Sequence, residues 1–175
     1  MQYRYVGVMV AALAALGCSN LTDSSGVAAA AGSYDTFFST TMSAPTISGS
    51  ATLPQTLGTI SLGKPAGNGT FSGSFSITGN GGSGTVAGTM ASGGAVTISH
   101  FGDPSRSPLQ SVAFLETLMP SCDFTQAVSG AMSGAVQNGK LALTGALTLP
   151  CSWTSGGSTV VVPTVATVQM SGSQD

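Results

Sequence analysis

The chain has very few charged side chains. Of its 175 residues, 4 are Lys or Arg and 6 are Asp or Glu, so charged residues make up 6% of the sequence, against about 25% in an ordinary soluble domain. Four cations are too few for the basic patch that a nucleic-acid-binding protein needs, which excludes nucleic acid as a partner. The same scarcity excludes a highly charged disordered tail.

Groups suited to catalysis or metal binding are also scarce. His100 is the one histidine of the sequence, and with Asp103 it could join a serine in a triad, but no G-x-S-x-G turn accompanies the pair. The acidic residues are scattered, which indicates neither a carboxylate pair nor a calcium loop, and no C-x-x-C motif indicates zinc. We therefore expect no enzyme activity, no metal and no cofactor.

The N-terminal segment has the pattern of an export signal. Arg4 supplies a positive charge, and residues 6–16 form an apolar run. This run is shorter than the about 20 helical residues that span a bilayer, and it has the length of a signal-peptide core. The sequence therefore predicts an exported protein.

The end of this segment, Ala15-Leu16-Gly17-Cys18, resembles the lipobox of bacterial lipoproteins, although Leu16 departs from the family pattern at its position. The resemblance implies cleavage before Cys18 and a diacylglyceryl group on its thiol, often with an amide-linked chain, so that the protein is stably anchored to a membrane. Ser19 in place of Asp favours the outer membrane. An ordinary signal peptide with an incidental cysteine, or a short membrane anchor, is the alternative.

These patterns divide the chain into three parts. Residues 1–17 are expected to be the signal peptide, and residues 18–33, which are small, polar or Ala, are expected to be the lipidated cysteine and a flexible tether. Residues 34–175 are expected to form a single β-domain.

Two cysteines remain if Cys18 carries lipid. Cys122 and Cys151 flank two strand-like segments joined by Asn138-Gly139, the strongest hairpin signal in the chain. A hairpin folded there brings both cysteines to its open end. An even number of cysteines in an exported protein favours a bond between them, so we predict a Cys122–Cys151 disulfide.

Alternation with a period of two dominates the remaining sequence, which predicts half-buried strands. The expected strands cover 34–40, 46–53, 56–62, 70–78, 85–91, 95–101, 128–136, 141–149 and 159–171, and Pro163 predicts an edge, bulge or bend. Such an antiparallel meander buries one face as a small β-barrel or as a two-sheet β-sandwich. Glycines recur on the apolar face at positions 73, 88, 130, 134 and 145, and they favour the strong curvature of a barrel.

One segment follows a helical period instead. Ser107-Pro108-Leu109-Gln110 matches a capping box with Pro at the first helical position, and apolar residues follow at helical spacing up to Pro120. We predict a short amphipathic helix over 108–119 that plugs or covers one end of the barrel. An extended crossover that carries Phe114 and Leu118 into the core is the alternative.

Two functions remain open for a lipid-anchored envelope protein of this kind. In the first, the barrel binds one small apolar ligand, because glycine-lined inner faces leave room inside. The predicted wall residues are Phe71, Phe75, Met90, Met132, Leu143 and Leu147. In the second, the same side chains form an ordinary core, and the protein is a structural or interaction lipoprotein without a small ligand. The expected partners are accordingly the membrane, through the anchor, and an apolar ligand or an envelope protein.

Overall fold

The structure is a computed structural model that describes residues 30–79, 81–103, 105–106 and 108–175. Its strands are β1 (Gly32–Ala44), β2 (Gly49–Thr52), β3 (Thr56–Leu62), β4 (Thr70–Ile77), β5 (Ser83–Met90), β6 (Ala95–Phe101), β7 (Val128–Ser129), β8 (Met132–Gln137), β9 (Lys140–Ser155) and β10 (Ser158–Gln174). Four 3-10 turns, η1 (Pro45–Ile47), η2 (Ser92–Gly94), η3 (Pro108–Ser111) and η4 (Phe124–Gln126), and one short helix, α2 (Ala113–Leu118), connect them. The predicted signal peptide and most of the predicted tether lie outside the described residues.

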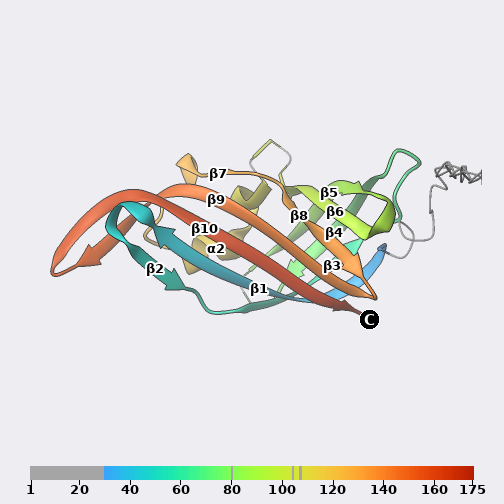
Figure 1. The fold of residues 1–175 in the computed structure, drawn as a ribbon, viewed down its shortest axis with the longest axis horizontal. Coiled ribbons are helices and arrows are strands. Elements are labelled where there is room, and N and C mark those ends of the chain that lie inside the picture. The colour runs from blue at the N-terminus through green and yellow to red at the C-terminus, as the bar shows by residue number, and fades with distance from the viewer. Residues whose placement is uncertain (1–29, 80, 104, 107) are drawn as a thin grey trace, which may run out of the picture.

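Eight of the strands close into an antiparallel barrel. The ladder runs β1-β3-β4-β5-β6-β8-β9-β10, and β10 pairs back onto β1. β2 adds to β1, and β7 adds to β9. The predicted barrel is therefore confirmed and the sandwich alternative is wrong, because every strand of the ladder has a partner on both sides. Figure 1 shows the strands wrapped around α2.

Glycines allow the neighbouring strands of this barrel to come close. A Cβ added at Gly88 would run into the carbonyl oxygen of Thr97, and one at Gly134 would run into that of Ala142. Only a residue without a side chain tolerates this approach, which supports tight coiling of the sheet. Gly130 differs: it lies between β7 and β8, and nothing lies within 4 Å of its added Cβ.

Several strand boundaries differ from the sequence prediction. The expected strand 46–53 begins only at Gly49, because Pro45–Ile47 form a 3-10 turn. The expected strand 128–136 is interrupted between β7 and β8, and Val128 is 68% exposed. β9 and β10 extend well past their predicted ends and form a long hairpin with Gly156 and Gly157 at its turn.

The predicted helix over 108–119 is present in a shorter form. Pro108–Ser111 make a 3-10 turn, Val112 is extended, and only Ala113–Leu118 are α-helical. Ser107, the predicted capping residue, lies outside the described residues. The helical period was still informative, because Leu109, Val112, Leu115 and Met119 are all buried.

Within the described part of the chain, no helix has the length and apolar character needed to cross a membrane.

Candidate functional site: the barrel interior

All six predicted wall residues point into the barrel and are buried. They come from four strands: Phe71 and Phe75 from β4, Met90 from β5, Met132 from β8, and Leu143 and Leu147 from β9. None is more than 5% exposed, and all belong to one continuous hydrophobic cluster. The structure therefore brings together the residues that the sequence grouped.

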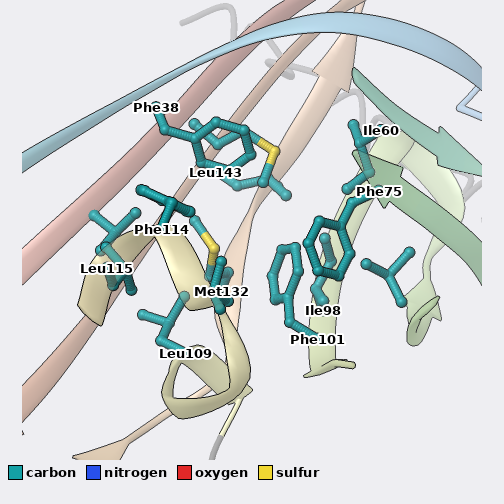
Figure 2. Packing of buried hydrophobic residues seen from close by; sticks show 14 of the residues in the cluster. Phe38, Ile60, Phe75, Ile98, Phe101, Leu109, Phe114, Leu115, Met132 and Leu143 are labelled. Carbon is teal, nitrogen blue, oxygen red and sulfur yellow. The ribbon is translucent and has the colours of Figure 1, made fainter. Parts of the chain in front are cut away.

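The segment that contains α2 lies against these wall residues. The Phe114 ring of α2 packs on Phe38 of β1 with ring centroids 5.2 Å apart. A Cβ on Gly145 of β9 would lie 2.6 Å from Cγ of Met132 and 3.2 Å from Cδ1 of Leu109, so the segment contacts β9 where that strand has no side chain. Figure 2 shows Leu109, Phe114 and Leu115 beside Met132 and Leu143. Residues 108–119, which we call the plug, thus fill this part of the barrel.

Hydrogen bonds hold the start of the plug and order the turn that follows its end. At its start, the Leu109 backbone N–H donates to Oγ of Ser129, 3.0 Å away, and Nε2 of Gln110 donates to the Phe124 carbonyl oxygen at 2.7 Å. After its end, Asp123 accepts hydrogen bonds from Thr125 and Gln126. The hydroxyl of Thr125 is the main cause that lowers the pKa of Asp123 below its ordinary 3.8.

The predicted disulfide is present and holds the plug to the barrel wall. Cys122 follows the plug and Cys151 lies in β9, with their Cα atoms 4.0 Å apart. The backbone supports the same contact, since the Asp123 N–H donates to the Pro150 carbonyl and the Ser152 N–H donates to the Ser121 carbonyl. The bond therefore ties the C-terminal end of the plug to the strand that carries Leu143 and Leu147.

Polar groups also lie on the inner face of β1. Oγ1 of Thr36 donates to the Gly58 carbonyl at 2.9 Å, and the Tyr34 hydroxyl donates to the Ala30 carbonyl at 2.8 Å. Burial raises the pKa of Tyr34. Oγ1 of Thr40 is buried and has no hydrogen-bond partner among the described residues. Among the described residues of β1, Thr40 thus supplies a buried hydroxyl that its surroundings do not satisfy.

The structure also places the residues considered for a triad. His100 lies at the end of β6, and its Nδ1 is buried without a partner in the described chain. Asp103 accepts hydrogen bonds from the N–H and hydroxyl of Ser105, which lower the pKa of Asp103. Across the described ranges, no three of His, Cys, Asp and Glu gather in a way that could hold a metal ion.

Sequence reasoning missed a second surface, at the turn of the β9–β10 hairpin. Figure 1 shows this hairpin projecting past the β1–β2 turn, at the opposite end from the C-terminus. A groove of about 540 Å³ lies there beside Trp153, whose ring packs 3.0 Å from a Cβ added at Gly49. Val160 and Val161 are 44% and 67% exposed. The run Val160-Val161-Val162, which breaks the period of two, was the available signal.

The predicted lipidation site, Cys18, lies outside the described residues, so its role stays a prediction. Compared with known protein families, curated proteins and solved structures, the chain matches none.

Proposed function

We propose that the protein is an exported lipoprotein of the bacterial cell envelope, anchored at the outer membrane through Cys18, and that it acts through its surface rather than by holding a small molecule. The observation that carries the second part is the plug. The six wall residues belong to one buried hydrophobic cluster that includes Leu109, Phe114 and Leu115 of the plug, and Figure 2 shows Met132 and Leu143 beside that segment. An eight-stranded barrel is only just wide enough for side chains to fill, so this interior is a core.

The disulfide supports export. Disulfides persist in oxidising compartments such as the periplasm and are rare in the cytosol, and Cys122 and Cys151 are bonded. The third cysteine, Cys18, directly follows the predicted signal peptide. Modification of Cys18 would leave no free thiol in the mature chain.

Palmitate labelling tests the anchor. Cells that express the full chain are grown with labelled palmitate, and the protein is compared with Cys18→Ser and, as a matched control, with Ser19→Ala. We expect label and membrane fractionation for the wild-type chain and for Ser19→Ala, and neither for Cys18→Ser. Label that persists in Cys18→Ser would refute the lipoprotein assignment.

A second function, the binding of an apolar ligand with a polar end, is favoured by Thr40. Its buried hydroxyl lacks a partner among the described residues, and it lies on the same inward face of β1 as Phe38, which contacts the plug. A ligand that displaced the plug could accept this hydrogen bond. Native mass spectrometry of the purified protein tests it, because a bound apolar molecule would add a defined mass and no adduct would exclude this function.

A further inference from the structure

The outer edge of β10 near the hairpin turn has free backbone groups. β1 pairs with β10 only up to Val165, opposite Ser43. Beyond that point, the described strand that pairs with residues 158–164 is β9. The last part of β10 is therefore one side of a two-stranded ribbon.

The register identifies which groups of this edge are free. Pro150 and Ser152 of β9 direct their backbone groups toward Asp123 and Ser121, and hence away from β10. In an antiparallel pair, residues opposite each other either both face their partner or both face outward. Their partners Pro163 and Val161 therefore direct their backbone groups away from β9.

Thr159, two residues before Val161, faces the same way. The edge thus offers the N–H groups of Thr159 and Val161, and the carbonyl groups of Thr159, Val161 and Pro163. The side chains of residues 159–162 are β-branched, all those of residues 159–163 are uncharged, and no charged residue occurs between Leu141 and Gln174. Natural proteins usually protect such edges with charge, because an uncharged free edge is a template for another strand.

We propose that this edge pairs with the same edge of a second copy, antiparallel and related by a two-fold axis near Val161. In that register, each Val161 N–H donates to the Val161 carbonyl of the other copy, and each Thr159 N–H donates to the other Pro163 carbonyl. Pro163, which has no N–H, then lies at the end of the ladder. Closed two-fold dimers are the commonest protein oligomers.

Charge favours a second copy over a charged partner. Two uncharged edges meet without repulsion, whereas a charged partner would lose hydration and find no counter-charge between residues 141 and 174. A copy also supplies the matching pattern of donors and acceptors.

Light scattering of the full chain in mild detergent tests the pairing. We expect the protein mass of two chains for the wild type and half that mass for Val161→Lys. Val128→Lys is the matched control, because Val128 is an equally exposed strand valine, and it should keep the mass of two chains. Val161→Pro removes an N–H that the β9–β10 ladder does not use, so it should also halve the mass while the circular dichroism spectrum is retained.

Cross-linking locates the contact. Variants with one added cysteine, at one of the positions 159–163, are treated with a short bismaleimide cross-linker. Val128→Cys is the control, and the wild-type chain gives the background dimer yield that Cys18 alone could produce. Dimer yield should exceed both references at positions 159–163. A wild-type mass of one chain, or no excess over Val128→Cys, would overturn the proposal. Binding to lipid vesicles is measured for the same variants. If Val161→Lys loses vesicle binding but keeps the protein mass of the wild type, the edge contacts a lipid surface and the dimer proposal is overturned. Palmitate labelling remains an independent test of the anchor.

Discussion

Two threonines of β1 allow a sharp test of how the barrel interior is stabilised. Thr36 and Thr40 both point inward and are 2% and 1% exposed. The Thr36 hydroxyl donates to the Gly58 carbonyl, whereas the Thr40 hydroxyl has no partner among the described residues. Threonine and valine have nearly the same shape and both suit strands, so replacement with valine isolates the hydroxyl.

The two replacements should change stability in opposite directions. A buried polar group without a hydrogen bond costs about 1–3 kcal/mol, while a satisfied one contributes about 1 kcal/mol. We therefore expect Thr40→Val to raise the free energy of unfolding by about 1 kcal/mol and Thr36→Val to lower it by about the same amount. For a domain of this size, each change corresponds to a shift of about 2–4 °C in the unfolding temperature.

Urea denaturation followed by circular dichroism measures this difference. The midpoints of the two variants should lie on opposite sides of the wild-type midpoint, with the slope of the transition unchanged, because the slope reports the surface exposed on unfolding. If Thr40→Val destabilises the protein as much as Thr36→Val, the reasoning is refuted and the Thr40 hydroxyl has a partner. That result would favour the ligand-binding function.

Two further predictions concern the end of the plug. The Cys122–Cys151 bond closes a loop with a sequence separation of 29, so its reduction should lower the free energy of unfolding by about 3–4 kcal/mol. Thermal unfolding with and without reductant measures this change. A Cys122→Ala/Cys151→Ala variant is the control and should not respond to reductant. Because the pKa of Asp123 is lowered in the folded state, its contribution is present above pH 3.8 and is lost as the pH falls through the folded pKa. Stability curves of the wild type and Asp123→Asn should therefore converge below about pH 3.8, and parallel curves would contradict the assignment.

The strands could be predicted because one face of each is buried and the other is not. Phe71 and Phe75 alternate with exposed serines in β4, and this contrast is local. The β8–β9 turn was equally clear, since Asn138 and Gly139 both adopt positive φ, 52° and 69°, which few residue pairs tolerate. Such features depend on neighbours in the sequence.

Features that depend on distant contacts were harder to predict. Val112 was expected to be helical, but it is extended and 2% exposed, because the barrel interior determines the position of its side chain and a β-branched residue has little helical preference to oppose this. The contact between Phe114 and Phe38 joins residues on separate elements, and no local pattern indicates it. The same limit applied to Val128, whose exposure results from the break between β7 and β8.

Closure of the barrel explains how a domain with so few charges can manage its strand edges. Each strand of the eight-stranded ladder has two neighbours, so these edges need no charged side chains to prevent association. The β9–β10 hairpin extends past the end of β1, so the last part of β10 pairs with β9 alone among the described strands. Its edge from Thr159 to Pro163 has neither a second paired strand among the described residues, the 3-10 turn η1 being the element that lies next to β10, nor a charge. A lysine at position 161 would hinder strand pairing without disturbing the core, because Val161 is 67% exposed. The valine at this position is therefore the strongest physical reason to expect a partner strand there.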